Sequence, residues 1–150
     1  MLILGPYRSH DSIEILEHLK ECLRRRGYSL ADIVRDISYR NRMGNESVET
    51  YYLEKSRDLI SNWAQAALFV FPKNCDYSGV LIEFDHMLNK AGWLLESSTV
   101  FFEKSGFEKV SLMLKGLVKS SSVNQGFFVN DGELCDRSVA ELTSHLLNVY

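Results

Sequence analysis

Short apolar segments alternate with longer stretches of helical periodicity along this chain, and this alternation constrains the fold more than any other feature. Five segments are short, apolar and predicted as strands: 1–4, one within 28–34, 67–71, 99–103 and 126–129. Apolar residues recur at helical spacing in four others: 11–27, 49–65, 79–91 and a last one beginning at 138. Because connections of this length suit crossovers between parallel strands, we predict an α/β fold. The expected architecture is a three-layer (αβα) Rossmann-like single domain over residues 1–150, with a parallel sheet of about five strands.

Local signals give the expected helix starts. Asp11 with Glu14, and Ser138 with Glu141, have the spacing of a capping box, and they predict helices that begin near Asp11 and Ser138. The polar segment 36–47 predicts a mobile loop.

Composition and charge exclude several classes of protein. Hydrophobic residues make up 45% of the chain and charged residues 25%, as in an ordinary globular protein. No apolar run is long enough to span a bilayer, and the N-terminal segment lacks the pattern of a secretory signal. A net charge of -3 argues against a protein that binds the nucleic-acid backbone. We therefore expect a cytoplasmic protein with neither a membrane nor a nucleic acid as its partner.

The cysteines and histidines predict no metal or disulfide chemistry. Cys22, Cys75 and Cys135 are scattered and have no CxxC spacing, so neither a disulfide framework nor a zinc site is expected. The four histidines lack metal-ligand spacing with acidic neighbours. We expect no metal and no cofactor.

Two loops are candidates for ligand binding, because ligands of parallel sheets bind at the carboxyl ends of the strands. The first loop has the sequence GPYRSHD after the first strand. There Gly5 permits close approach, Arg8 offers a bidentate anion-binding group and Ser9 a hydroxyl at a helix start. The second loop, DYSGVLIEF, follows the third strand and includes Glu83.

Glu83 has two interpretations. It falls one turn into the helix that begins at Gly79, where the helix N-terminus would keep the carboxylate ionised near neutral pH, as a nucleophile requires. In the other interpretation it is an ordinary acidic residue of a first helical turn, with its head group in water.

Several short motifs resemble one enzyme family. They are ILGPYR at the first strand, Asp58 within SRDLISNWAQAALFVF, Gly79-Val80-x-x-Glu83, and SLMLKG beginning at Ser111. Their order resembles the nucleoside 2-deoxyribosyltransferases and the related 2'-deoxynucleoside 5'-phosphate N-hydrolases, and more distantly TIR-like NAD hydrolases. A looser likeness is to uncharacterised archaeal proteins with a Gly-Pro-Tyr-Lys start and a Gly-Val-Gly-Ile-Glu motif.

The resemblance implies cleavage or transfer at an N-glycosidic bond of a nucleoside, a nucleotide or NAD. Glu83 would be the nucleophile, and Asp58 would orient a sugar hydroxyl or protonate the leaving base. The substrate-binding residues would be Gly5, Tyr7, Arg8, Ser9, Gly79 and Ser111, with Tyr7 beside the sugar and base and Arg8, Ser9 and Ser111 around a 5'-phosphate. A homodimer is also implied.

The chain departs from the family pattern at three positions, which leaves a second function open. Leu81 replaces a glycine, Ala67 replaces an aspartate, and Asp85 stands where a glycine follows the glutamate motif. These changes favour a non-catalytic nucleotide-binding domain, for sensing or signalling, as the alternative. The aromatic residues Tyr51, Tyr52 and Trp63 are interpreted as core or dimer contacts, because they recur at helical spacing.

Overall fold

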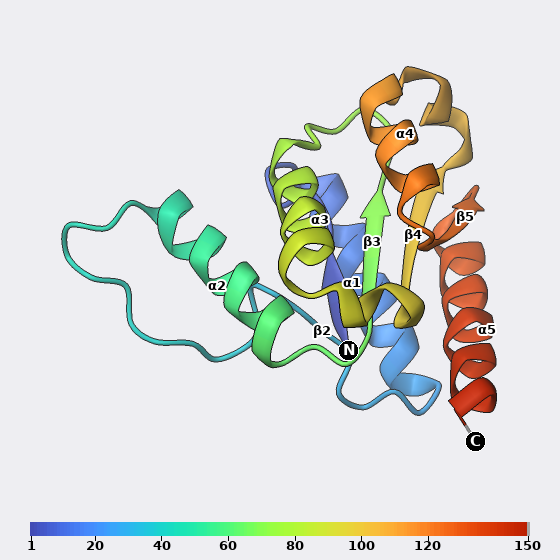
Figure 1. Ribbon diagram of the computed structural model, residues 1–150, viewed down its shortest axis with the longest axis horizontal. Coiled ribbons are helices and arrows are strands. Elements are labelled where there is room, and N and C mark those ends of the chain that lie inside the picture. The colour runs from blue at the N-terminus through green and yellow to red at the C-terminus, as the bar shows by residue number, and fades with distance from the viewer. Residues whose placement is uncertain (150) are drawn as a thin grey trace.

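A computed structural model describes residues 1–149 and contains a five-stranded parallel sheet (Figure 1). The strands are β1 (Leu2–Leu4), β2 (Asp32–Ile33), β3 (Ala67–Phe71), β4 (Ser98–Glu103) and β5 (Asn124–Phe128). Their order in the sheet is β2-β1-β3-β4-β5, and all neighbours are parallel. The predicted α/β architecture is therefore confirmed.

Helices cover both faces of the sheet. They are α1 (His10–Arg25), α2 (Val48–Asn62), α3 (Ser78–Lys90), α4 (Leu112–Ser120) and α5 (Asp131–Val149), with short 3-10 helices at η1 (Gly92–Ser97) and η2 (Lys104–Lys109). Buried side chains of α2, α3 and α4 pack in one core, and those of α1 and α5 pack in the other. In Figure 1, α3 and α4 accordingly lie in front of the sheet and α1 behind it.

Strand β3 shows why the sheet is covered on both sides. All of its residues are buried, and they alternate between the two cores. Phe69 and Phe71 pack toward α3, whereas Leu68 and Val70 pack toward α1 and α5. A continuous apolar run of this kind is typical of a central parallel strand.

Two helix starts differ from the prediction, and one helix was not predicted. Helix α1 is capped by Ser9, whose Oγ accepts from the backbone N–H of Ser12 at 3.2 Å, so Asp11 lies inside the first turn. Helix α5 begins at Asp131, where the Asn130 side chain accepts from Glu133 N at 2.9 Å. Ser138 lies within that helix, and its hydroxyl donates to the Leu134 carbonyl at 2.7 Å. Helix α4 was not predicted.

The segment 36–47, predicted as a mobile loop, is tied to α2 through Arg40. The guanidinium of Arg40 lies 2.6 Å from Oε1 of Glu46 and 2.6 Å from Oε2 of Glu54. It also lies 5.6 Å from the ring centroid of Tyr39 and 5.4 Å from that of Tyr51. The loop and the first half of α2 therefore form one unit, which projects from the body of the molecule in Figure 1.

A disulfide joins Cys22 on α1 to Cys135 on α5, with 6.2 Å between the two Cα atoms. The expectation of no disulfide is wrong, because spacing along the sequence does not tell which helices are neighbours in the fold. Cys75 is the free cysteine. Within residues 1–149, no helix combines the length and the apolar character that a membrane crossing requires.

Candidate functional site

A cavity lies at the carboxyl edge of the sheet, where the connections that follow two neighbouring strands run to opposite faces. Strand β1 leads into α1 on one face and its neighbour β3 leads into α3 on the other, which is the topological switch point where open α/β sheets bind ligands. A cavity of about 420 Å³ is lined there by the loops after β1, β2 and β3 and by α2 and α3. This volume is in the range of small-molecule sites.

Glu83 lines this cavity and is buried. Its side chain shares a face of α3 with Val80, Phe84 and Met87, which are all in the core. The Phe84 ring meets the Phe69 ring edge-to-face at 5.1 Å and fixes the orientation of the helix. Only 7% of Glu83 is exposed, so the interpretation of a head group in water does not fit.

The Glu83 carboxyl is neutral over much of the physiological range. Among the residues that the structure describes, its Oε2 has no hydrogen-bond partner. Burial raises the pKa of Glu83 to about 8, against a smaller opposing effect of the Ser56 hydroxyl. The expectation of an ionised carboxylate is therefore wrong. Glu83 lies five residues after the helix start at Ser78, beyond the first turn where the free N–H groups act, so desolvation prevails.

Tyr7 borders the same cavity with its hydroxyl occupied. The hydroxyl donates to the Ile3 carbonyl at 3.1 Å. Burial raises the pKa of Tyr7, and the nearby Glu83 raises it further. Tyr7 is thus a neutral wall of the cavity rather than an acid.

Arg8 and Asp76 meet across the cavity from the loops after β1 and β3. Nη1 of Arg8 lies 3.1 Å from Oδ2 of Asp76, and both side chains are exposed. Asp76 also accepts from Ser78, from its backbone N at 2.9 Å and its Oγ at 2.7 Å, and these bonds hold the pKa of Asp76 below its usual range. Asp76 therefore orders the start of α3.

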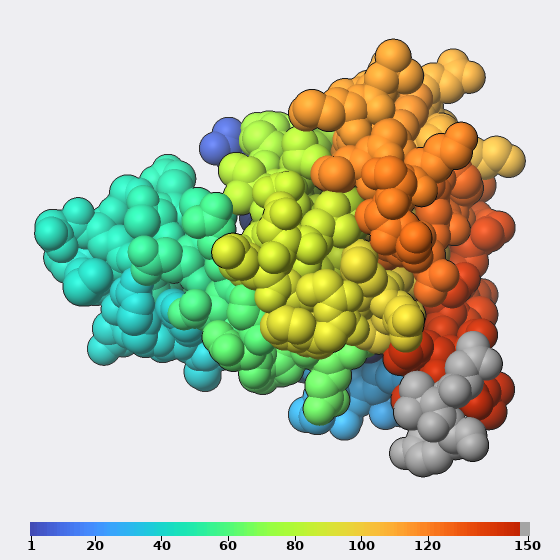
Figure 2. All heavy atoms as spheres, viewed as in Figure 1, coloured from blue at the N-terminus to red at the C-terminus, as the bar shows by residue number. Residues whose placement is uncertain are grey.

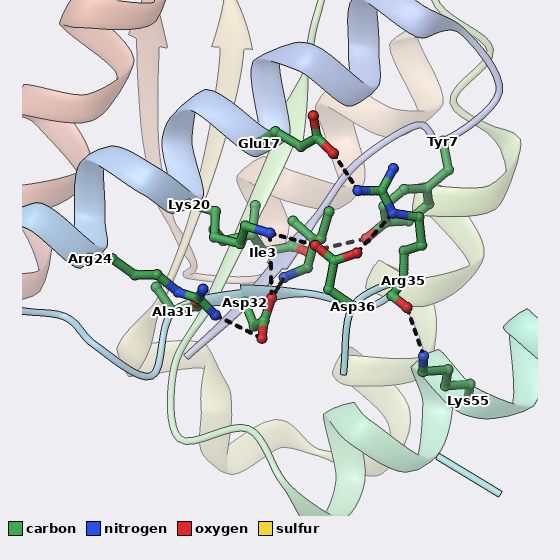
Figure 3. A network of polar contacts seen from close by, with 11 residues as sticks. Ile3, Tyr7, Glu17, Lys20, Arg24, Ala31, Asp32, Arg35, Asp36 and Lys55 are labelled. Carbon is green, nitrogen blue, oxygen red and sulfur yellow. Dashed lines mark hydrogen bonds and ion pairs between the residues drawn. The ribbon is translucent and has the colours of Figure 1, made fainter. Parts of the chain in front are cut away.

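Arg35 supplies a second guanidinium to the cavity lining, and a polar network holds it (Figure 3). Its side chain pairs with Asp36, Nε to Oδ1 at 2.9 Å, and with Glu17 on α1. Lys20 joins Asp36, and the buried Lys55 donates to the Arg35 carbonyl at 3.2 Å. The network thus fastens the loop after β2 to both α1 and α2.

The two predicted glycines have different roles. A Cβ at Gly5 would lie 2.8 Å from Leu16 Cδ2 and 3.1 Å from the Val70 carbonyl, so Gly5 allows β1, β3 and α1 to pack closely. A Cβ at Gly79 would meet nothing within 4 Å. Since Gly79 lines the cavity, its missing side chain leaves space for a ligand.

Three predicted site residues are not part of the cavity lining. Asp58 is exposed on α2, because the face of the helix that packs in the core consists of Ser56, Leu59 and its other buried residues. Its carboxylate accepts a hydrogen bond from the Tyr39 hydroxyl. Ser9 and Ser111 are the N-caps of α1 and α4. The structure therefore brings Glu83, Arg8, Tyr7, Gly5 and Gly79 together, and leaves Asp58, Ser9 and Ser111 outside.

Residues of α2 that line the cavity were not identified as site residues from sequence. Val48, Glu49, Tyr52 and Leu53 form this wall. A signal was present, since Val48, Tyr52 and the buried Ser56 follow one another at intervals of four residues. That spacing places them on one helix face, but it does not distinguish a core contact from a cavity wall.

A small group of possible metal ligands occurs elsewhere, at the start of α1. Ligand atoms of His10, Asp11 and Glu14 lie within 4.8 Å of one another, and all three residues are exposed. Exposed acidic residues are favourable in the first turn of any helix, so this group needs no ion to explain it.

Comparison of the chain with protein-family models, with curated proteins and with solved structures gave no match. The functional interpretation therefore depends on the cavity and the residues around it.

Proposed function

We propose that the protein binds a nucleoside, a nucleotide or NAD in this cavity and cleaves its N-glycosidic bond by hydrolysis or transfer. One observation carries the proposal: the buried carboxyl of Glu83, whose Oε2 has no hydrogen-bond partner within residues 1–149, lines a ligand-sized cavity at the switch point of the sheet. A buried polar group without a partner is unfavourable for folding, and its retention is typical of a functional site.

The proposed reaction has two steps. The ionised Glu83 attacks the anomeric carbon, a carbon–oxygen bond forms, and the bond to the base nitrogen breaks with its electron pair on that nitrogen. The anionic base of a nucleoside or nucleotide takes a proton from water, whereas the nicotinamide of NAD leaves as a neutral base. A water molecule then attacks the anomeric carbon, gives up a proton and displaces the Glu83 carboxylate. If a second base attacks in place of water, the result is transfer. The positive charge that develops on the sugar favours a fixed carboxylate in a water-poor cavity.

The ion pairs around the cavity fit an anionic group on the substrate. Arg8 is held to Asp76 by one exposed contact of 3.1 Å, which a phosphate can replace at little cost. Arg35 is fixed more firmly by Glu17 and Asp36. Arg8 is therefore the proposed phosphate contact.

A non-catalytic nucleotide-binding domain is the second candidate, and two observations favour it. Glu83 is mostly protonated at neutral pH, which is unfavourable for a nucleophile. Asp58, the expected second acidic group, lies outside the cavity lining. This candidate predicts ligand binding without release of base.

Incubation with nucleosides, their 5'-monophosphates and NAD tests the proposal, with free base and sugar measured by liquid chromatography. We expect release of base by the wild-type protein, at least a hundredfold slower release by Glu83→Gln, and unchanged release by Glu21→Gln, a control at an exposed position on α1. Binding with no release from any substrate would support the second candidate. The implied homodimer and cytoplasmic location are separate proposals, which light scattering and cell fractionation would test.

A further inference from the structure

The first half of α2 presents a largely apolar wall to the cavity, with Glu49 as its charged residue. Val48 is 49% exposed and Tyr52 41% exposed, and both line the cavity with Leu53. The buried residues of α2 all lie in its second half: Lys55, Ser56, Leu59 and Ile60. Figure 2 shows a hollow between this part of α2 and α3. Apolar side chains on this wall would lose contact with water if a flat ligand filled the hollow.

The ring of Tyr52 is held in place by neighbours on its own helix. The Tyr51 ring meets it edge-to-face at 5.3 Å, and Nζ of the buried Lys55 lies 5.7 Å from its centroid. Tyr51 in turn donates to the Arg40 carbonyl at 2.7 Å, which connects it to the loop that precedes α2. An aromatic ring fixed in this way is a suitable stacking surface, because little side-chain freedom is lost when a ligand binds.

Most of the charged groups of the cavity lining lie on elements other than α2. Glu83, Arg8 and Asp76 supply carboxyl and guanidinium groups from α3 and the loops after β1 and β3. On α2 the cavity thus has an aromatic ring and two aliphatic side chains beside Glu49, whereas its other charged groups lie on α3 and on the loops that follow the strands. A nucleoside has the same division, with a flat base at one end and a polar sugar at the other.

We infer that Tyr52 is the residue on which the base of the substrate stacks, and that it selects an aromatic base. The inference depends on the proposed function, and it adds a specificity-determining residue that the sequence motifs do not include. With the base against Tyr52, the sugar lies toward Glu83 and a 5'-substituent toward Arg8.

The fluorescent nucleoside 2-aminopurine riboside tests the inference, because stacking on an aromatic ring quenches its fluorescence. The measurement uses the Glu83→Gln protein, so that the ligand is not consumed, and compares Tyr52→Leu and Tyr52→Phe in that background. Trp63→Leu is the matched control, since Trp63 ends α2 with a similar exposure of 39% and does not line the cavity. Circular dichroism confirms that each variant is folded, and Tyr52→Gln replaces the leucine variant if that one is not.

We expect the fluorescence of 2-aminopurine riboside to be quenched equally, and its affinity to be equal, in the protein that retains Tyr52 and in the Tyr52→Phe variant. The Trp63→Leu variant should give the same quenching and affinity. The leucine variant should lose quenching and bind roughly 5- to 150-fold more weakly, as base–aromatic stacking predicts. Binding of ribose 5-phosphate, measured by calorimetry, should not change between these proteins.

The outcomes separate the inference from the proposed function. Equal quenching and affinity in the leucine variant would overturn the inference alone, and so would an equal loss of affinity for ribose 5-phosphate, because the ring would then contact the sugar. Quenching without base release by the wild type would overturn catalysis and support the inference. An absence of nucleoside binding to the wild type would overturn both.

Discussion

Arg8 and Asp76 connect the loops after β1 and β3, with Nη1 of the arginine 3.1 Å from Oδ2 of the aspartate. Asp76 also orders the start of α3 through Ser78, so one carboxylate links the cavity's principal guanidinium to the helix that contains Glu83. The charge that a ligand meets at this cavity therefore depends on whether Asp76 holds Arg8.

Replacement of Asp76 by asparagine should release Arg8 for a phosphate. The amide oxygen of asparagine can still accept from Ser78, so the start of α3 is kept. We expect the affinity for adenosine 5'-monophosphate relative to adenosine to rise about tenfold, measured by calorimetry at low salt. Asp136→Asn, which breaks an exposed pair with Arg26 of 2.9 Å, is the control and should leave the ratio unchanged. A ratio equal to that of the wild type in Asp76→Asn would contradict the phosphate role of Arg8.

The raised pKa of Glu83 should make the folded protein less stable as pH increases. The pKa is about 8 in the folded state and 4.5 for an ordinary glutamate. Between these values the folded protein keeps a proton that the unfolded chain has released, so the free energy of unfolding falls with pH. The contribution of this group has a slope of about 1.4 kcal/mol per pH unit at most, and it ends above pH 8. Urea unfolding at several pH values should show this fall in the wild type and a smaller one in Glu83→Gln, and parallel curves for the two proteins would refute the assignment.

Base release should have the opposite dependence on pH. Only the ionised carboxylate attacks, so the rate should rise through neutral pH and level off above about 8. Initial rates at constant ionic strength measure this dependence. A rate that is flat from about pH 5 to 9 would show that the ionisation of Glu83 does not limit the reaction.

Replacement of Gly79 by leucine should fill the cavity without damage to the fold. Apart from its chain neighbours and its own helix backbone, no atom of residues 1–149 lies within 4 Å of a Cβ at this position, and leucine favours a helix over glycine by up to about 1 kcal/mol. We expect an unchanged or higher melting temperature together with loss of binding of 2-aminopurine riboside. Gly116→Leu, on α4 and equally free of neighbours within 4 Å, should have the same effect on stability and none on binding. Normal binding by Gly79→Leu would place the ligand elsewhere.

The disulfide between Cys22 and Cys135 should stabilise the folded state. It closes a long loop, with a sequence separation of 113, and such bonds contribute roughly 2–4 kcal/mol. The double variant Cys22→Ala, Cys135→Ala should therefore have a lower free energy of unfolding, and reductant should have no further effect on it. Thiol titration in denaturant should give one free thiol before reduction, from Cys75, and a value of three would show that the bond is absent.

The sheet could be predicted from sequence because its three central strands, β1, β3 and β4, are buried on both faces. In β3 every side chain enters one of the two cores, and the resulting continuous apolar run is typical of a central strand. Helix α4 has only Leu114 and Val118 fully buried, while Leu112 and Met113 are exposed, so its apolar residues do not mark one face. The start of α5 depends on the capping bond of Asn130, whereas the capping-box spacing of Ser138 and Glu141 predicts a later start.

The candidate site was predictable only in part, because its chemistry depends on contacts between distant segments. The position of Glu83 near the start of α3 was read correctly, but its protonation is decided by burial against other elements. Asp58 matched a motif but lies on the exposed side of α2. Tyr52 was interpreted as a core or dimer contact, whereas it lines the cavity.

Strand β2 has a further consequence for self-association. It is an outer strand of the sheet and only two residues long, and one of these, Asp32, is paired with Arg24 at 2.9 Å. Because this edge strand is short and charged, it offers few free backbone N–H and C=O groups to a strand of another chain. This side of the protein is therefore protected from edge-to-edge aggregation. A second copy that continued the sheet would have to do so beside β5, and otherwise the two copies would meet through their helices.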